Sequence, residues 1–404
     1  MHMLQLLHNQ LIESLPNIHK KRLERLLTTV SCLLMGALLT LSALGRKTRG
    51  KAKVKNKIKA IDRLLSNRHL YAEQISIYTV TAAKIIGHLT DVDILVDWSP
   101  AGNRKNHMLR ASIAFDGSSV TIYQEVHPEK LLGNYNVHKS FLKKLAQVIP
   151  AHCNVNIITD AGFRTEWFEL VQEQGWYFTG RVLGTINYKL DGAQNWELCS
   201  SLHATASNIP QYIGHGVLAK ERSLKCEIYL YSDKLCRDKS STNQKLRKKK
   251  RRKIKSGKSH KAYKKVYETP WLLVTSKTHK TNNAKKIVKE YSRRMKIEHD
   301  FRSTKNHKTG LGLNVNSVNV ENPRKLAILL LIASLAMFIL WLVGLAAEAK
   351  KLHYSFQANT YRHKRVLSLI FLGLQVIEHC LEAIKIEDVF DALLKVQQME
   401  ENFI

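Results

Sequence analysis

The segment from Leu326 to Ala347 constrains the fold most, because its 22 residues contain no charged side chain. A helix of this length is long enough to cross a bilayer, and it is equally suited to burial on all sides in a large core. Basic residues flank it at both ends and give no orientation for a membrane span. We expect a core helix, since catalytic-looking residues lie just upstream. A membrane-attached protein with a polybasic loop is the alternative.

The charge balance indicates the class of partner. The net charge is +31 over 404 residues, which favours nucleic acid or an anionic membrane as the partner. The length allows two or three domains. The cysteines include no CxxC pair, which argues against a zinc site or a disulfide framework. The N-terminus lacks a signal-peptide pattern, so we expect a cytoplasmic protein.

Residues 1–75 are expected to be helical and basic. Within 45–70, Lys and Arg are dense, and the apolar residues from Ile58 to Leu65 recur at helical spacing. A small helical basic unit is typical of a DNA-binding domain, and a solvated charged helix is the alternative. The apolar residues 29–44 predict one further core helix.

Between residues 76 and 182 the pattern is that of an α/β layered fold. The expected elements are strands at 94–97, 108–115 and 119–125, a helix at 138–148, a strand at 155–159, a helix at 165–174 and a strand at 176–182. Asp116 and Gly117 predict a hairpin turn. Asp97 and Asp160 are expected at the carboxyl ends of strands, where active sites form in open α/β sheets.

Two later regions depart from this order. Residues 183–285 contain strand-like pieces at 226–231 and 271–276 and a run of Lys and Arg at 245–255. Like charges at this density repel until an anion binds. We therefore expect a flexible loop that contacts DNA phosphates through residues that include Lys248, Lys249, Arg251 and Arg252; a solvated loop without a role is the alternative. Residues 366–404 predict amphipathic, mainly acidic helices, which favour either a contact with another protein or packing within the chain.

A basic stripe with one carboxylate is predicted near residue 300. On one continuous helix its members fall within an arc of roughly 80° and a length of about 21 Å, and they are Tyr291, Arg294, Glu298, Arg302 and Lys305. We expect the opposite side to face solvent; it carries Arg293, Lys296, Asp300, Ser303 and Thr304. Burying a carboxylate is costly unless it is paired or holds a metal, so Glu298 is a candidate ligand.

Asp97, Asp160 and Glu298 are together the candidate catalytic residues and metal ligands. Three carboxylates can hold a pair of Mg²⁺ or Mn²⁺ ions, which prefer oxygen ligands. Two such ions roughly 4 Å apart stabilise the attacking and leaving oxygens of a phosphoryl transfer. Asp91 and Asp93 are rivals near the first strand, and we prefer Asp97 because it directly follows the apolar run.

The residues around Glu298 resemble a known family. The pattern Tyr291-x2-Arg294-x3-Glu298-x6-Lys305 is similar to the signature of the insertion sequence four family of bacterial DDE transposases. Asp97 in LVDWS and Asp160 in ITDAGF resemble the first and second acidic residues of that family. The resemblance extends over nearly the whole chain, including the basic segment 45–70.

This resemblance implies an RNase H-like catalytic core interrupted by a β-rich insertion. The implied activity is Mg²⁺-dependent cut-and-paste transposition by a homodimer, acting on the terminal inverted repeats of its own element and on target DNA in the bacterial nucleoid. The implied regions are a helical DNA-binding domain at 1–75, the core at 76–182 and 286–365, the insertion at 183–285 and a C-terminal helical dimerisation region at 366–404.

The resemblance also implies a hairpin intermediate, formed when a freed 3′-hydroxyl attacks the opposite strand. A base flipped out of the stack is held by aromatic stacking, and Trp271 occupies the place of the stacking Trp in relatives. A buried strand Trp is the alternative. Arg302 and Lys305 match positions that contact DNA near the cleavage site, and Tyr291 and Arg294 match contacts around the flipped base.

A second hypothesis is a DNA-binding protein whose RNase H-like core no longer cleaves DNA. Such a protein would not need the catalytic carboxylates. All three are present in this chain, which argues for the enzyme.

Overall fold

A computed structural model describes most of the chain as two compact units. One unit comprises Met1–Val155 with Met295–Ile404, and the other comprises Asn156–Arg294. The described residues are 13–102, 105–115, 118–232, 269–278, 283–306, 311–312, 320–358, 360 and 363–401. The expected loop with Lys248, Lys249, Arg251 and Arg252 and the expected turn at Asp116 and Gly117 lie outside them.

The first unit contains an antiparallel sheet in the order β3-β2-β1. Its strands are β1 (Asp91–Ala101), β2 (Asn106–Phe115) and β3 (Ser118–Pro128). The sequence predicted a strand ending at Asp97, and this was wrong, because β1 continues to Ala101. Side chains alternate between the two faces of a strand, so polar residues on one face do not end it when the other face stays packed.

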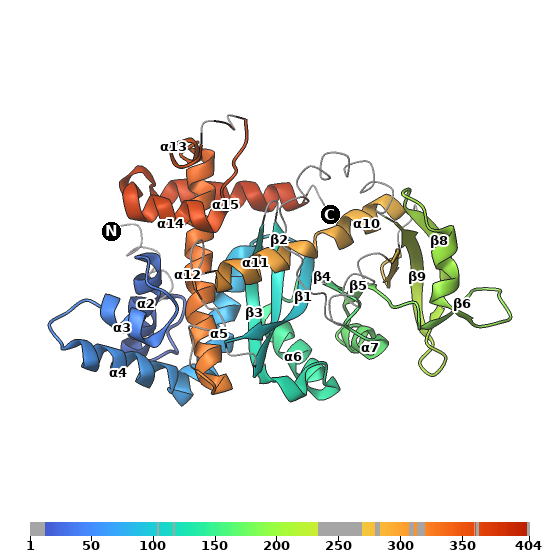
Figure 1. Cartoon of the computed structure of the whole chain (residues 1–404), viewed down its shortest axis with the longest axis horizontal. Helices are drawn as coiled ribbons and strands as arrows, with labels where there is room; N and C mark the ends of the chain where they lie inside the picture. Colours follow the sequence, from blue (N-terminus) through green and yellow to red (C-terminus); the bar gives the residue numbers. More distant parts are fainter. Residues whose placement is uncertain are drawn as a thin grey trace, which may run out of the picture. The chain divides into compact units, whose positions relative to one another are not determined.

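Helices cover both faces of this sheet (Figure 1). On one face lie α11 (Met295–Lys305) and α12 (Pro323–Ala349), and Gln124 of β3 donates to the Leu330 carbonyl at 3.0 Å. On the other face lies α6 (Tyr135–Val148), whose Phe141 ring is 5.3 Å from that of Tyr123. Helix α5 (Arg68–Ile86) packs beside β3 and α6. The α/β layering predicted for this region is therefore confirmed.

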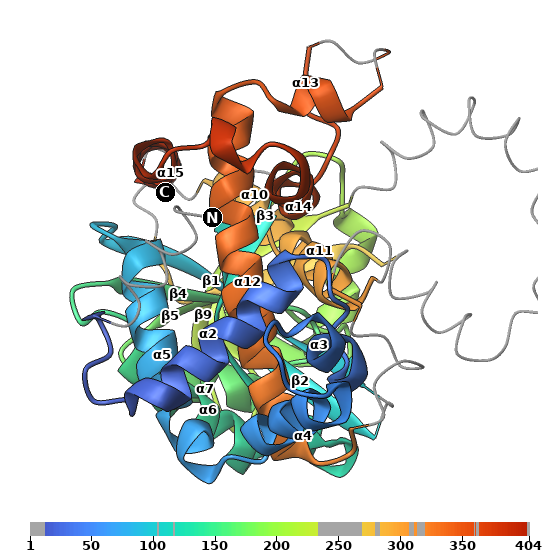
Figure 2. The same ribbon diagram turned by 90° about the vertical axis from the view of Figure 1, so that its left-hand side faces the viewer.

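Helix α12 is the core helix of the first unit. Every residue from Leu326 to Ala347 is buried, and α12 is the one described helix long and apolar enough to cross a membrane. It packs against β3, α5 and four further helices (Figure 2), α2 (Lys20–Leu34), α4 (Val54–Leu65), α14 (Leu369–His379) and α15 (Ile386–Glu401). Apolar residues all round a helix need such a complete cover, so the predicted core packing is confirmed.

The described residues of the N-terminal region are mainly helical, as predicted, with one difference. The apolar run 29–44 is split between the end of α2 and the start of α3 (Leu41–Lys47), and α4 (Val54–Leu65) follows. Gly36 has φ +83° just after the end of α2, and a positive φ ends a right-handed helix. Helix α5 runs through residue 75, where the sequence predicted a domain boundary.

The C-terminal helices pack within the chain. Helices α14 and α12 cross so closely that a Cβ on Gly344 would lie 2.2 Å from the Leu369 carbonyl oxygen. A Cβ on Gly373 would lie 2.0 Å from the Leu340 carbonyl oxygen. Both helices therefore need glycine at this crossing. The remaining elements of this unit are α13 (His353–Phe356) and the 3₁₀ turns η1 (Glu129–Leu131) and η4 (Leu381–Ala383).

The second unit is a sheet with one parallel pair and several antiparallel strands, in the order β4-β5-β10-β9-β8-β6-β7. The sequence predicted β4 (Asn154–Thr159), α7 (Thr165–Glu173), β5 (Tyr177–Arg181), β9 (Leu224–Tyr231) and β10 (Trp271–Thr275). It missed β6 (Asn187–Leu190), β7 (Glu197–Leu198), the 3₁₀ turn η2 (Cys199–Thr205) and β8 (Gln211–Leu218). Helix α10 (Ala284–Ser292) ends this unit and packs on β5, β8 and β9.

We predict that Gly344→Ala and Gly373→Ala each lower the free energy of unfolding by about 1–3 kcal/mol, because the added methyl group overpacks the crossing. Alanine is the better helix former by about 1 kcal/mol, so helix propensity alone predicts the opposite sign. Urea unfolding followed by circular dichroism measures the difference. Ala349→Gly at the exposed end of α12 is the control, because it exchanges alanine and glycine in the same helix away from the crossing and so measures helix propensity alone. Variants at the crossing as stable as the parent would contradict the close packing.

Candidate active site

The predicted stripe does not lie on one continuous helix, so that prediction was wrong. Helix α10 ends at Ser292 and α11 begins at Met295. Between them the amides of Arg293 and Arg294 bond to carbonyls three residues back, at Glu290 and Tyr291, as in a 3₁₀ turn. Tyr291 and Arg294 thus belong to the second unit, whereas Glu298, Arg302 and Lys305 belong to the first.

The orientation of α11 also differs from the prediction. Asp300 and Thr304 were expected to face solvent, but they are 3% and 0% exposed. Asp300 accepts hydrogen bonds from Ser112 at 3.0 Å and from Thr121 at 2.7 Å, and it forms an ion pair with Arg110 at 3.2 Å. Polar residues were expected to mark the solvent face of the helix. In α11 they contact polar residues of the sheet instead.

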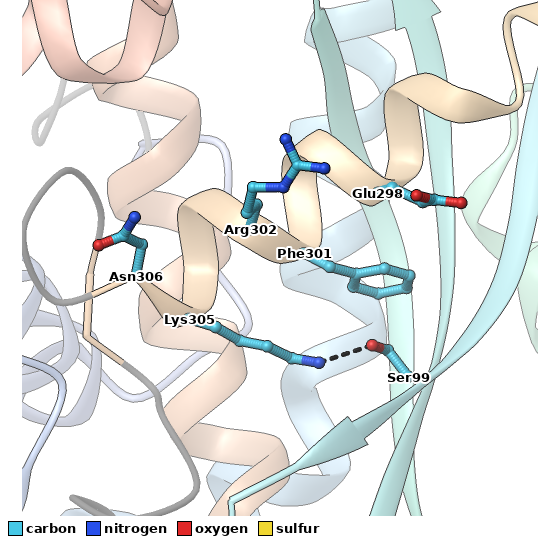
Figure 3. Close-up of a pocket in the computed structure, with 6 residues that line it drawn as sticks. All are labelled: Ser99, Glu298, Phe301, Arg302, Lys305 and Asn306. Carbon is cyan, nitrogen blue, oxygen red and sulfur yellow. Dashed lines mark hydrogen bonds between the residues drawn. The ribbon is translucent and has the colours of Figure 1, made fainter. Parts of the chain in front are cut away.

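The outer side of α11 borders a hollow of about 460 Å³ that has a basic rim (Figure 3). The hollow is lined by Ser99, Glu298, Phe301, Arg302, Lys305 and Asn306. Lys305 donates to the Ser99 hydroxyl at 2.6 Å, and its ammonium lies 5.5 Å from the centre of the Phe301 ring. Arg302 is exposed and Glu298 is half-buried. A carboxylate and two cations thus face one open space.

Asp97 lies two residues before Ser99 on β1, on the same face of the strand as this lining residue of the hollow. Its side chain accepts a hydrogen bond from the Trp98 amide at 2.7 Å. Burial and, to a lesser extent, the nearby Arg110 lower the pKa of Lys305, Asp97 raises it, and the net value is about 8. Asp97 is therefore close enough to Lys305 to interact electrostatically. At about 3.3 Å per residue along β1, the rivals Asp93 and Asp91 lie roughly 13 Å and 20 Å farther along the strand.

The other face of β1 is held by a polar cluster around Trp98. The Trp98 indole donates to His138 at 3.1 Å, and its ring lies 5.8 Å from that of His127. Burial lowers the pKa of His138 to about 4, so this imidazole is neutral at pH 7 and can accept the bond. Burial raises the pKa of Glu125, but hydrogen bonds from His127 and Lys144 outweigh it and hold the value at about 2.

In the second unit, Asp160 lies near the predicted DNA contacts Tyr291 and Arg294. Asp160 follows β4 directly, as predicted, and accepts a hydrogen bond from the Gly162 amide at 2.8 Å. Burial raises the pKa of Tyr291 to about 12, with Arg294 and Arg181 lowering it and Asp160 raising it. The neutral phenol of Tyr291 thus shares one electrostatic environment with Asp160 and two arginines.

Trp271 belongs to the same group in the second unit. It is half-buried at the start of β10, and its ring lies 5.1 Å from Tyr291 and 5.6 Å from Tyr231, both edge to face. Arg181 donates to the Thr269 hydroxyl at 2.6 Å, which fixes the chain just before Trp271. The structure therefore brings Asp160, Trp271, Tyr291 and Arg294 into one unit.

The predicted metal ligands divide between the two units. In the described part of the chain, no group of three or more His, Cys, Asp or Glu side chains lies close enough to hold a metal ion. The donor chemistry still fits Mg²⁺, because Asp97 and Glu298 offer half-buried carboxylate oxygens beside the hollow. In Asp160, the oxygen Oδ1 already accepts a backbone hydrogen bond that orients the carboxylate.

Sequence reasoning missed Arg110, Ser99 and Asp300 as parts of the site. A signal for Arg110 was present, because it is a lone charge inside the otherwise uncharged strand MLRASIAF. A charged residue at a strand centre indicates a buried partner. Asp300 carried no comparable signal, since a carboxylate on a short helix reads equally well as a solvent-facing residue.

The comparison with protein families identifies the class of this chain. Residues 91–337 match the transposase DDE domain, more than half of the chain. The chain therefore belongs to the DDE transposase family, whose members act on DNA and use divalent metal ions. The matched range contains Asp97, Asp160 and Glu298. No curated protein matches the chain.

We predict that DNA affinity falls as pH rises from about 7.5 to about 9. Lys305 has a pKa of about 8 in the protein alone, so above that value its side chain is mainly a neutral amine that must regain a proton to bind a phosphate. The loss reaches at most about tenfold per pH unit. Lys305→Arg should keep its charge and remove this dependence. Fluorescence anisotropy with a duplex measures both, and identical pH profiles would contradict the role of Lys305.

Proposed function

We propose that this protein is the transposase of an insertion sequence and catalyses cut-and-paste transposition. Within the DDE family, the Tyr-Arg-Glu-Lys pattern favours the insertion sequence four family, and in particular a resemblance to the transposase of insertion sequence ten. The observation that carries the proposal is the family match across all three carboxylates, together with a hollow in which Glu298 lies among Arg302 and Lys305.

Asp97, Asp160 and Glu298 are the proposed ligands of Mg²⁺, for which Mn²⁺ can substitute. The bound ions would activate a water or a 3′-hydroxyl and stabilise the leaving oxygen. Arg302 and Lys305 would hold the phosphates of the strand being cut. Lys305 is suited to this role because its hydrogen bond to Ser99 and its place over Phe301 fix the ammonium. Arg302 is exposed and suited to bidentate contact.

The decisive substitution is Glu298→Gln, which keeps the shape of the side chain and removes its charge. We predict loss of Mg²⁺-dependent nicking of DNA that carries the element ends, because a neutral amide is a poor ligand for a hard cation. End binding should stay within about twofold, because most of the affinity comes from contacts between Lys or Arg and phosphates. Gel assays of nicked products and of bound DNA measure the two quantities.

One control variant and one competing function sharpen this test. Glu321→Gln removes an exposed carboxylate of the same unit that pairs with Lys105, and it should cleave like the parent. The competing function is a DNA-binding protein that no longer cleaves. A parent protein that binds ends but never nicks them with Mg²⁺ or Mn²⁺ would favour that function, and nicking retained by Glu298→Gln would exclude Glu298 as a ligand.

We further propose that transposition passes through a DNA hairpin and that Trp271 stacks on the flipped base. The support is its half-buried place next to Tyr291, with Arg294 and Arg181 in the same electrostatic environment. Base stacking on an aromatic side chain contributes about 1–3 kcal/mol. Tyr291 and Arg294 would contact the phosphates around that base.

Trp271→Ala should therefore stop the reaction after the first nick, with hairpin yield reduced by about tenfold or more. Trp271→Phe keeps an aromatic face and should retain most of the yield. Denaturing gels resolve nicked, hairpin and excised products. An unchanged hairpin fraction in the alanine variant would remove Trp271 from the mechanism.

The remaining regions are assigned by charge. Three arginines from α2 and α4 line a hollow of about 220 Å³ in the N-terminal helices, Arg22, Arg25 and Arg63; this supports DNA binding by residues 1–75. Lys248, Lys249, Arg251 and Arg252 would add non-specific phosphate contacts.

The acidic α15 leaves Phe390, Leu394 and Met399 exposed, which supports a homodimer contact through 366–404. We place the protein in the bacterial cytoplasm, with the nucleoid.

A further inference from the structure

A buried network of polar side chains joins α11 to the sheet in the first unit. Its centre is the ion pair between Arg110 and Asp300, whose side chains are 1% and 0% exposed. Arg110 also donates to Gln124 at 2.9 Å and 2.8 Å and to Thr304 at 3.0 Å. Ser112 and Thr121 donate to the other carboxylate oxygen of Asp300. Strand and helix thus share one fully buried network.

The two charged residues of this network lie close in the fold to two proposed metal ligands, Asp97 and Glu298. Arg110 is the direct cross-strand partner of Asp97. Asp300 lies two residues after Glu298, about 200° around the helix axis, so the two carboxylates point to opposite sides of α11. One ion pair therefore joins the strand position beside Asp97 to the helix turn that carries Glu298.

Packing of α11 against the sheet does not require the charges of Arg110 and Asp300. Ile297 and Phe301 are buried on the same helix, and apolar contacts of this kind are not directional. A rotation of α11 by one residue, about 100°, would keep apolar contact but would break the bonds of Asp300 and leave Arg110 unpaired. Buried charges without partners are strongly disfavoured, so the network excludes such rotated packings.

From this geometry we infer that Arg110 and Asp300 are positioning residues that set the rotation of α11 and so place Glu298 relative to Asp97. The inference rests on the proposed function, because it assumes that Glu298 is a metal ligand. Neither residue contacts the metal or the DNA in this account. Gln124 extends the network by donating to Tyr78 and to the Leu330 carbonyl, which ties it to α5 and α12.

The test replaces both charges together, in the double variant Arg110→Met with Asp300→Leu. Apolar residues of similar volume often replace a buried ion pair without loss of stability. Binding of Mn²⁺ to the complex with end DNA is followed through the electron paramagnetic resonance signal of free Mn²⁺. We expect a folded protein that binds ends like the parent but binds Mn²⁺ about 10–100-fold more weakly, as for other residues that orient metal ligands.

Thr121→Val gives a second test that keeps both charges. It removes the 2.7 Å hydrogen bond to Asp300 at nearly constant volume, and we expect Mn²⁺ binding to weaken severalfold. The matched control is Thr81→Val, also buried in the same unit, whose hydroxyl bonds to the carbonyl of Ile77 in its own helix at 3.0 Å. It should leave Mn²⁺ binding unchanged.

A double variant that folds and binds Mn²⁺ like the parent would overturn the inference. If the double variant does not fold, equal Mn²⁺ affinity of Thr121→Val and Thr81→Val overturns it. Glu298→Gln separates this failure from failure of the proposed function. Weakened Mn²⁺ binding in Glu298→Gln with parental binding in the network variants rejects the positioning role alone, whereas parental Mn²⁺ binding in Glu298→Gln rejects the ligand assignment itself.

Discussion

A charged pair sealed between a helix and a sheet organises the first unit of this transposase. Arg110 and Asp300 are both buried. Removing one partner of such a pair lowers the free energy of unfolding by about 3–5 kcal/mol, because the other charge is left unpaired in the core. With the pair satisfied, α11 presents Glu298, Arg302 and Lys305 to one hollow. Burial lowers the pKa of Lys305, and the nearby Arg110 adds to this effect.

The rest of the first unit packs around this arrangement. Helix α12 fills the core, and Leu330 and Met337 contact the polar network through a backbone carbonyl and a sulfur atom. On the other face of β1, Trp98 is held by a neutral His138. Asp97 therefore lies on a strand that is packed from both sides. A support of this kind suits phosphoryl transfer, where catalysis depends on the positions of the ligands.

Much of the fold could be predicted from the sequence. The uncharged run at 326–347 predicted the core helix, and short strand-like runs predicted β1 to β5, β9 and β10. Charge patterns were less informative. Polar residues on α11 were taken as a solvent face, although Asp300 and Thr304 bond to buried groups of the sheet. The break between α10 and α11 carried no glycine or proline signal. Partners distant in sequence decide both features, and helical spacing does not reveal them.

The three proposed ligands can be tested together by locating Mn²⁺ through anomalous scattering in a crystal of the protein with its paired end DNA. We predict manganese bound by the carboxylates of Asp97, Asp160 and Glu298, with Arg110 and Asp300 still paired behind α11. Manganese bound by Asp91 or Asp93, or manganese without Glu298 among its ligands, would contradict this prediction.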